Sequence, residues 1–587
     1  MIDFIKGMLG SMFGVLAAVG ILFIFGVSMI AVVGSADKGK AILQDNSILR
    51  LSLDVPISEV PNESPFENIA GVLQSDEKSP LTMKEILDAI DNAKEDEKIK
   101  AIYIDGGIFM GGKAMATEIR MALLSFKESG KKIYTYADMI AENAYLYISV
   151  SDEIYLNPAG IMEFDGLTAN VVYYKDFLDK LGVEMQVFRV GKYKSAVEPF
   201  LDNEMSESNR EQITSYLNGM YDFYLSSIAE SRGMEVKMLE KASDHAKIRT
   251  PEDAVNYKLI TKVGYRDEAI DKIKTDLGLS TDESIYLVNV KKYAAPEEGP
   301  EMNQGSHIAV LTCEGNIVDG KGMPGQIGGD KVAAQLKKLR EDDNVKAVVL
   351  RINSPGGSGL ASDIMWREIQ LMKTKKPIIA SMSNVAASGG YYMAMGCDKI
   401  LAYPNTITGS IGVFSLIPNA KELLEDKLGM KTYTVSTGEF SMTPVLDALS
   451  PKEQEIVQQF VDNFYETFTA KAAAGRNMDQ EKLKEYAQGR VWTGKQAKEI
   501  GLVDELGGID KAVELAAESA GLEEYDIQYY PRKKSFAELL MQDVAEQYTR
   551  AQLKEKLGPF YQIYENAQLV GEMKGVQAIM PYQLNIQ

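Results

Sequence analysis

EDDNVKAVVLR, residues 341–351, decides the fold because the same pattern occurs once before, as EDEKIKAIYID at residues 95–105. A second pair of segments, SDEIYLNP (151–158) and CDKILAYP (397–404), has the same displacement of 246 residues, with no gap needed between the two matches. One short match would be chance. Two matches in one register indicate that the chain contains an internal duplication.

Each copy alternates strand-like and helix-like segments. In the second copy the expected strands are 307–315, 346–352 and 376–383, separated by amphipathic helices at 331–343 and 361–375. The first copy has the same order over 48–55, 83–96, 100–105, 114–129 and 131–138. This alternation predicts βαβ units and therefore parallel sheets with helices on both faces. The fold class is α/β, with two related domains.

The composition describes a large acidic protein. At 587 residues the chain exceeds one ordinary core, and two to four domains are expected. The formal net charge is −21 and no block of Lys or Arg opposes it, which argues against nucleic acid as a partner. Cys313 and Cys397 lie far apart in apolar segments, so neither a disulfide framework nor a metal cluster is indicated.

The N-terminus carries the longest apolar run. Residues 12–33 are almost wholly apolar, and about 20 such residues span a bilayer as a helix. The alternative is a cleaved signal peptide, whose apolar region is normally only about 7–15 residues long. We therefore expect an uncleaved anchor that contacts the lipid bilayer through residues 12–33. Lys6 on one side and Lys38 and Lys40 on the other leave the membrane orientation undecided.

The stretch NVAASGGYYMA (384–394) holds a serine that the first copy lacks, because Ser388 falls opposite Glu142. Ser388 follows an expected strand and precedes a short buried helix, where free backbone N–H groups favour negative charge. The glycine-rich loop NSPGGSG (353–359) also lies at a strand end and could supply further N–H groups for an oxyanion hole. The alternative is that both segments are turns without any chemistry.

A nucleophilic serine needs a base, and the chain contains only 2 histidines. His307 begins an expected strand and His245 lies in a polar segment. Neither has a motif around it, so a Ser-His-Asp triad has little support. The other base available to serine is a lysine that burial keeps neutral.

The segment MQVFRVGKYKSAVEPF (185–200) offers two lysines, Lys192 and Lys194, after an expected strand. Chemistry alone does not choose between them, and both could be ordinary surface lysines. A displacement of 247 places Lys194 opposite Ser441, so the first copy keeps a lysine that the second lacks. This mirrors the loss of the serine and predicts one composite site with a residue from each half.

Five motifs together carry a resemblance to a known family. They are GKYKSAVEPF, NSPGGSG, NVAASGGYYMA, TITGSIGVF and GRVWTGKQAKEIGLVDELGG. In this order and spacing the chain resembles the bacterial signal peptide peptidase A family, in its long, duplicated, membrane-anchored form, over residues 48–530. The resemblance implies two tandem Clp-protease/crotonase-like domains of ββα units. It also implies a serine peptidase that works with no cofactor and no metal.

The resemblance assigns roles to six residues. It implies that Ser388 is the nucleophile, that Lys194 is the general base and that Ser410, in TGSIG, orients the lysine. The oxyanion hole would be formed by Gly389 together with Gly356 and Gly357 of the glycine-rich loop. All six motif positions are intact in this chain.

The resemblance further implies a homotetramer shaped as a bowl that opens toward the membrane, with the active sites in an apolar groove. The substrates would be remnant signal peptides and other apolar peptides. The protein would be a single-pass protein of the bacterial inner (cytoplasmic) membrane, with its catalytic domain outside the cytoplasm.

The expected organisation has four parts. Residues 1–36 form the anchor, 47–295 the repeat that supplies the lysine, 306–530 the repeat that supplies the serine, and 531–587 a C-terminal extension. Apolar spacing in the extension predicts one or two amphipathic helices. Two other functions fit the same scaffold, namely a crotonase-like acyl-CoA enzyme and a non-catalytic membrane scaffold.

Overall fold

The computed structural model describes residues 43–61, 79–294, 305–442, 445–532 and 575–580. The predicted anchor at residues 12–33 lies outside these ranges. Within them, no helix combines the length and the apolar character that a membrane span requires.

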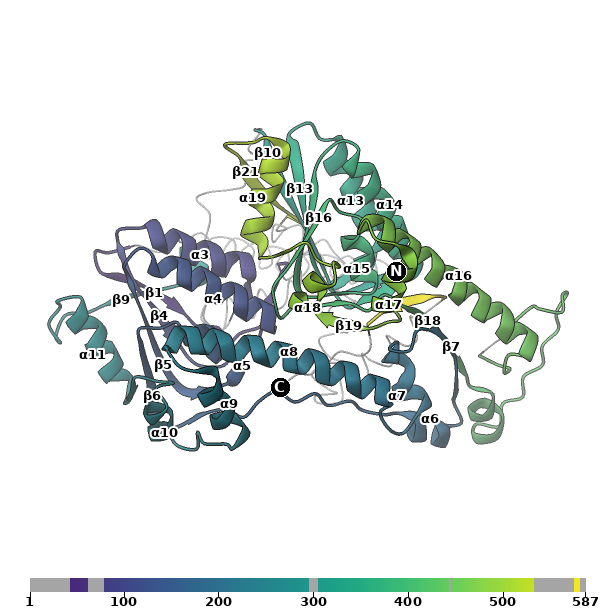
Figure 1. Ribbon diagram of the computed structural model, residues 1–587, viewed down its shortest axis with the longest axis horizontal. Coiled ribbons are helices and arrows are strands. Elements are labelled where there is room, and N and C mark those ends of the chain that lie inside the picture. The colour runs from purple at the N-terminus through teal and green to yellow at the C-terminus, as the bar shows by residue number, and fades with distance from the viewer. Residues whose placement is uncertain (1–42, 62–78, 295–304, 443–444, 533–574, 581–587) are drawn as a thin grey trace, which may run out of the picture.

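The described part of the first half forms a parallel sheet in the order β8-β6-β5-β4-β1-β9, with helices packed on it (Figure 1). Strand β4 is buried along nearly its whole length, as expected for a central parallel strand. Helix α3 begins with a capping box between Thr82 and Glu85 and buries Ile86 and Ile90 against the sheet. The strands are β1 (Ser47–Leu51), β4 (Ile99–Asp105), β5 (Lys132–Ile140), β6 (Glu153–Met162), β8 (Lys262–Val263) and β9 (Tyr286–Asn289). The helices are α3 (Met83–Glu95), α4 (Lys113–Lys127), α5 (Glu142–Ile148), α8 (Glu207–Arg232), α9 (Val236–Asp244), α10 (Pro251–Asn256), α11 (Arg266–Asp276) and α12 (Val290–Tyr293).

The second half repeats this plan, with the strand order β19-β17-β15-β13-β10-β21 and a branch through β16 and β20. Ala101 of β4 pairs with Ile48, and Ala347 of β13 pairs with Ile308, each next to a bulge at the start of the partner strand. The two alanines are 246 residues apart, so the strand pairing confirms the duplication. The strands are β10 (His307–Glu314), β13 (Val345–Ser354), β15 (Ile378–Ala387), β16 (Lys399–Ala402), β17 (Ile407–Gly409), β19 (Val491–Thr493), β20 (Glu505–Leu506) and β21 (Asp526–Tyr530). The helices are α13 (Gly329–Glu341), α14 (Gly359–Lys373), α15 (Gly389–Ala394), α16 (Pro451–Gly475), α17 (Gln480–Tyr486), α18 (Gly494–Glu499) and α19 (Ile509–Ala520).

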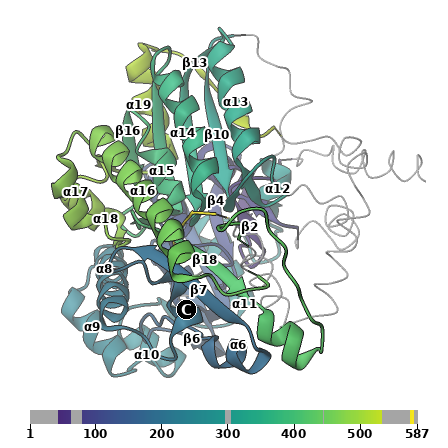
Figure 2. The same cartoon turned by 90° about the vertical axis from the view of Figure 1, so that its right-hand side faces the viewer.

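A third sheet joins the two halves. The repeat pattern of the sequence does not predict this sheet. Its order is β12-β11-β14-β22-β18-β7, and the first-half strand β7 pairs antiparallel with β18 of the second half. Figure 2 shows these two strands side by side. The strands and adjoining short helices are α6 (Lys175–Leu181), β7 (Glu184–Val190), α7 (Glu198–Leu201), β11 (Asn316–Val318), β12 (Gln326–Gly328), β14 (Gly356–Ser358), β18 (Val413–Asn419) and β22 (Gln577–Ile579). The repeats are therefore not two self-contained units.

The structure describes a small part of the C-terminal extension. Of residues 531–587 it describes 531–532 and 575–580, and Gln577–Ile579 form strand β22. The amphipathic helices expected in this extension stay a prediction. The remainder of the extension lies outside the described residues.

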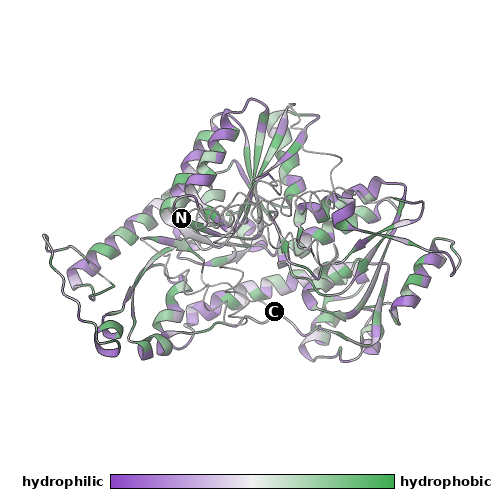
Figure 3. Cartoon of the chain, turned by 180° about the vertical axis from the view of Figure 1, so that it is seen from behind, coloured by the Kyte–Doolittle hydropathy of each residue, from purple (hydrophilic) through white to green (hydrophobic). Residues whose placement is uncertain are grey.

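Two further contacts hold the halves together. Helix α8 runs beneath both halves (Figure 1): its Tyr224 belongs to the core of the first half, while Tyr216 packs in a cluster with Ala387 of the second half. Asn384 of β15 accepts hydrogen bonds from the first N–H groups of α4, at Ala114 (3.0 Å) and Met115 (3.1 Å). The second half thus caps a helix of the first. Apolar residues are concentrated along the strands of the sheets (Figure 3).

Candidate active site

Ser388 lies at the tight corner between β15 and α15. Its backbone has φ 54° and ψ −110°, a conformation that few residues other than glycine adopt. Its N–H donates to the Gly409 carbonyl of the neighbouring strand end (2.8 Å), which fixes the corner. Such strained corners at strand ends commonly present a functional side chain. The Ser388 side chain is fully buried.

Lys194 comes from the loop after β7 and reaches the same point from the other half. Its side chain is fully buried, and this burial holds its pKa well below the usual value for lysine. Gly489, at φ +78°, leaves the space for it, because a Cβ at position 489 would lie 2.7 Å from the Lys194 Cα. The antiparallel pairing of β7 with β18 therefore carries the lysine into the second half.

The side-chain nitrogen of Lys194 has three oxygen neighbours. Its Nζ lies 2.9 Å from Ser388 Oγ, 3.1 Å from Ser410 Oγ and 3.2 Å from the Ser410 carbonyl oxygen. Ser410 follows β17 with φ 50° and donates its N–H to the Arg490 carbonyl (2.7 Å). The three predicted side chains are thus in hydrogen-bond contact, and none of them is exposed to solvent.

The glycine-rich loop lies beside the same corner. A Cβ at Gly356, where φ is +105°, would lie 2.8 Å from the Gly389 amide nitrogen, so only glycine allows this approach. The Gly356 N–H points to Ser354 Oγ (3.1 Å), whereas Gly357 pairs with Ala578 of β22. Both predicted glycines pair with β22, and the Gly356 N–H is already donated to Ser354 Oγ.

The remaining sequence candidates lie elsewhere. The Lys192 side chain is 57% exposed and forms an ion pair with Glu211, so the structure distinguishes it from buried Lys194. His245 and Ser441 are exposed, and His307 is buried at the start of β10. Both cysteines, Cys313 and Cys397, are free and buried.

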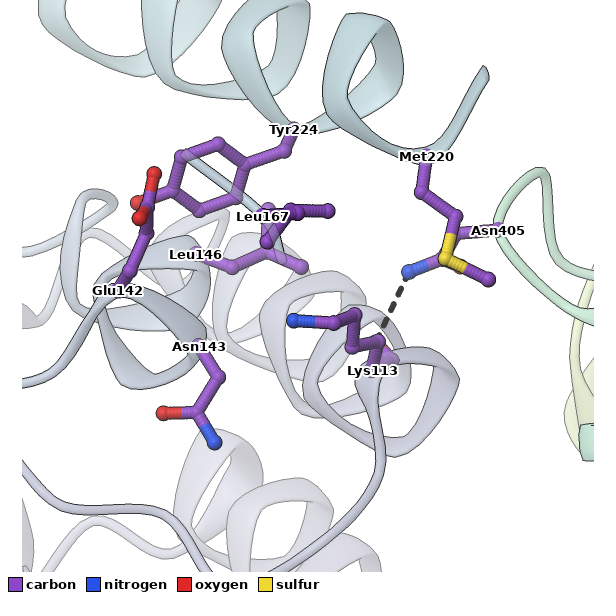
Figure 4. A pocket seen from close by; sticks show the side chains of 8 residues that line it. All are labelled: Lys113, Glu142, Asn143, Leu146, Leu167, Met220, Tyr224 and Asn405. Atoms are coloured by element: carbon purple, nitrogen blue, oxygen red, sulfur yellow. Dashed lines mark hydrogen bonds between the residues drawn. The ribbon is translucent and has the colours of Figure 1, made fainter. Parts of the chain in front are cut away.

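The corresponding corner of the first half holds no serine. Glu142 begins α5 and lines a cavity of about 20 Å³, room for about one water molecule, together with Lys113, Tyr224 and Asn405 (Figure 4). Burial raises the pKa of Glu142 to about 7. Measured from the helix start, the counterpart of Ser388 is Ala141 rather than Glu142, one residue away from the sequence alignment.

Sequence reasoning missed three contributors to the site. Gly489 and Gly412 surround Lys194, with the Gly412 Cβ position 3.3 Å from the lysine Cδ, and both follow from glycine-containing motifs already quoted. Strand β22 was missed altogether. Its short apolar segment VQAIM carries no turn or periodicity signal that would place it beside β14.

The sequence matches the family described as peptidase family S49 in two blocks, residues 125–280 and 370–523. The chain belongs to this family. Residues 310–408 also match the Clp protease family. The S49 domain thus occurs twice, and the expected duplicated, Clp-protease-like α/β architecture is confirmed.

Named relatives agree with this assignment. The S49 chain is 35% identical to Protease 4 of Haemophilus influenzae over 84% of this chain and 82% of the relative. It is 35% identical to the chloroplastic serine protease SPPA of Arabidopsis thaliana, over 77% of this chain and 68% of the relative. It is 42% identical to a putative signal peptide peptidase SppA of Enterococcus faecium, over 31% and 53%. This S49 peptidase is a serine protease.

Proposed function

We propose that the protein is an endopeptidase that works through a Ser–Lys dyad, with Ser388 as nucleophile and Lys194 as general base. The observation that carries the proposal is the 2.9 Å separation of Lys194 Nζ and Ser388 Oγ. This distance lies within the reach that a general base needs. The two residues come from different halves, so the duplicated chain forms one site.

The surroundings of Lys194 suit a neutral amine. A neutral amine has two N–H donors and one lone pair, and Nζ has three oxygen neighbours. The two N–H groups can donate to the two Ser410 oxygens, which leaves the lone pair for the Ser388 proton. Burial without a neighbouring carboxylate favours this form, because desolvation is the cause of the lowered pKa of Lys194.

The reaction follows from these positions. Lys194 takes the Ser388 proton as Oγ attacks a peptide carbonyl, and the Gly389 and Gly357 amides stabilise the oxyanion. The protonated lysine then gives its proton to the leaving amine. Lys194, neutral again, activates a water molecule, which hydrolyses the acyl-enzyme. We propose that Ser410 orients Lys194. Gly356, which has no side chain, leaves room for the substrate carbonyl.

The proposed substrates are remnant signal peptides and other apolar peptides. The relative named as a signal peptide peptidase supports this, as does the apolar run at residues 12–33, which would hold the enzyme at a membrane. We further propose a single-pass protein of the bacterial inner membrane, with a catalytic domain outside the cytoplasm and a homotetrameric assembly.

The test is covalent labelling of the detergent-solubilised full chain with a fluorophosphonate, with the labelled residue located by mass spectrometry. We expect label on Ser388, absent from Ser388→Ala and strongly slowed in Lys194→Ala. Lys192→Ala is the matched control and should label normally. Label at another serine, or labelling that does not depend on Lys194, would refute the dyad.

The pH dependence gives a second test. Lys194 is inactive as a base while protonated, so labelling and peptide hydrolysis should rise as pH increases through its lowered pKa. A rate that stays flat from about pH 5 to 9 would contradict a lysine base, since a general base must titrate near its working range.

A further inference from the structure

Helix α8 begins beside the loop that carries Lys194, and its residue Gln212 binds both neighbours of the lysine. The Gln212 side chain is 1% exposed. Its Nε2 donates to the Tyr193 carbonyl (3.0 Å) and to Ser195 Oγ (3.1 Å). A buried and satisfied polar network of this kind makes the backbone it binds rigid. Gln212 therefore restricts the position of the residue between its two partners, which is the proposed base.

The carbonyl end of the same amide holds a further segment of the site. Gln212 Oε1 accepts the Val491 N–H (3.3 Å) at the start of β19. The residue before it, Arg490, accepts the Ser410 N–H at its carbonyl oxygen (2.7 Å). One glutamine of the first half thus ties the lysine loop to the second-half segment that holds Ser410.

The partners of this amide determine which way it faces. A glutamine amide has an N–H₂ end that donates and a carbonyl end that accepts. The Tyr193 carbonyl can only accept and the Val491 N–H can only donate, so Nε2 faces the lysine loop and Oε1 faces β19. A methionine of similar length would make neither contact, and a glutamate would keep only the contact with β19.

The first turns of α8 are themselves held against the lysine loop. Buried Glu198, four residues after Lys194, accepts hydrogen bonds from Ser206 Oγ (2.6 Å), which caps α8, and from Asn209 Nδ2 (3.0 Å). Asn209 Oδ1 in turn lies 3.2 Å from Gln212 Nε2. Gln212 therefore projects from a fixed helix end, as a residue that sets the geometry of its neighbours must.

Loss of the amide would leave polar groups beside the lysine without their donor. Ser195 is 0% exposed, and its hydroxyl and the Tyr193 carbonyl both receive Gln212 Nε2. Buried polar groups that lose a partner take up water where there is room for it. Water at this place would lie next to Lys194, where desolvation keeps the amine neutral.

The charged groups around this loop are occupied with one another. They are Lys192 on the loop itself, Glu211 on α8, Arg490 before β19 and Glu198 of α7. Lys192 and Arg490 both pair with Glu211, at 3.8 Å and 3.4 Å, on the exposed side of the loop. Burial is the cause of the lowered pKa of Lys194, so this pKa should respond to hydration of the site.

We propose that Gln212 is a positioning residue for the base: it holds both neighbours of Lys194 against the segment of Ser410 and keeps water away from the amine. This inference rests on the proposed function. The hydrogen bonds of Gln212 within the described residues go to groups around the lysine, so it acts through Lys194. Its loss should change the chemical step and its pH dependence, but not the binding of peptide.

The test compares Gln212→Met with Gln370→Met in the detergent-solubilised full chain. Methionine keeps the length of the side chain and removes both ends of the amide. Gln370 of α14 is the matched control, because it donates one hydrogen bond to the Gly396 carbonyl (2.9 Å), beyond the end of α15 that is remote from Ser388. Hydrolysis of a fluorogenic apolar peptide is measured as kcat and KM across pH.

We expect Gln212→Met to move the rising limb of the pH–rate profile upward by at least about one pH unit, a part of the 3–5 units that full burial of a lysine can impose. On this limb kcat should fall about tenfold, because fewer molecules hold a neutral amine, and it should recover toward the wild-type value at high pH. KM should stay unchanged. Gln370→Met should keep the wild-type profile.

Gln212→Glu is a second variant that keeps the shape of the side chain and the acceptor for the Val491 N–H. Its carboxylate stabilises the protonated lysine, so the limb should again shift to higher pH. An equal fall in kcat at every pH, a raised KM with unchanged kcat, or a wild-type profile in both variants would overturn the inference. Failure of the dyad is distinguishable, because fluorophosphonate would then label Ser388 equally fast in wild type and Lys194→Ala.

Discussion

The two halves hold different groups at the carboxyl ends of equivalent strands. After β15 the second half carries Ser388, in contact with a lysine, whereas after β5 the first half carries Glu142 beside a cavity of about 20 Å³. The first half contributes Lys194 only because β7 leaves its own sheet and pairs with β18. Duplication thus preserved two scaffolds, and the third sheet brings one chemical group from each to a single corner.

A second equivalent position shows how the halves differ in their charges. Asp105 and Arg351 are 246 residues apart, on β4 and β13. Asp105 pairs with Arg50 and with Arg266, whose side chain is 49% exposed. Arg351 is buried and pairs with Glu59 at 2.7 Å and Glu118 at 2.5 Å, both of them buried first-half residues. The ion pairs of Arg351 therefore cross between the halves, while those of Asp105 stay within the first half.

The largest effect is expected when the lysine is removed from the first half. Lys194→Met keeps the length of the side chain and removes the base, so peptide hydrolysis should fall by about 10²- to 10⁴-fold, the usual contribution of a general base. Lys192→Met, two residues away and exposed, should hydrolyse peptide at the wild-type rate. Hydrolysis of a fluorogenic apolar peptide measures both.

The same variant should be more stable than wild type, which separates loss of chemistry from loss of fold. The folded protein lowers the pKa of Lys194 below its value in the unfolded chain, so folding expels a proton below pH about 10. Wild-type stability therefore falls as pH falls through this range, and methionine removes that cost. A lower thermal midpoint for Lys194→Met at pH 7 would contradict the buried neutral amine.

The next largest effect is expected at the buried ion pairs that cross the halves. Arg351→Met leaves Glu59 and Glu118 buried without their partner, which typically costs about 3–5 kcal/mol of unfolding free energy. Arg266→Met, at the equivalent pair of the first half, removes a half-exposed partner and should cost about 0–1 kcal/mol. Chemical denaturation of the two variants compares them. Equal losses would mean that the crossing pairs do not hold the halves together.

These comparisons also show which features of the fold and the site can be predicted from the sequence. The constant displacement of 246 residues predicts the sheets, and the pairings of Ala101 and Ala347 agree with it. Complementary loss of the serine and the lysine predicts a composite site, because each residue has a counterpart that lacks its chemistry. The local sequence pattern was sufficient to predict those strands that pair with other strands of the same copy.

The rest depends on contacts that no local pattern encodes. Lys192 and Lys194 have similar neighbours in sequence, and only the pairing of β7 with β18 buries one and exposes the other. Residues 576–580 become a strand because the glycine-rich loop offers them an unpaired edge, more than two hundred residues earlier in the chain. Such pairings between distant segments override local propensity.

A smaller effect is expected at the carboxyl group of the first half. Burial raises the pKa of Glu142 to about 7. Between the ordinary pKa of a glutamate and pH 7, the folded protein therefore keeps a proton that the unfolded chain has released. Stability should therefore fall as pH rises toward 7, by up to about 3 kcal/mol at 1.36 kcal/mol per pKa unit. Glu142→Gln should reduce the loss of thermal midpoint between pH 5 and pH 8, with peptide hydrolysis unchanged. An identical loss in both proteins would mean that Glu142 is charged throughout.

The smallest effect is expected at Ser410, which touches the lysine but not the attacked carbonyl. Ser410→Ala removes one acceptor from Lys194 Nζ, 3.1 Å away. One hydrogen bond contributes about 0.5–1.5 kcal/mol, which corresponds to a fall in rate of about two- to tenfold. An acceptor stabilises the protonated amine, so its loss lowers the pKa of Lys194 further. The rising limb of the pH–rate profile should then shift to lower pH while kcat falls. Ser415→Ala, at a buried serine of β18, is the matched control and should leave the profile in place. A fall in kcat without any shift of the profile would assign Ser410 a purely structural role and would leave the Ser410 carbonyl as the group that orients the amine.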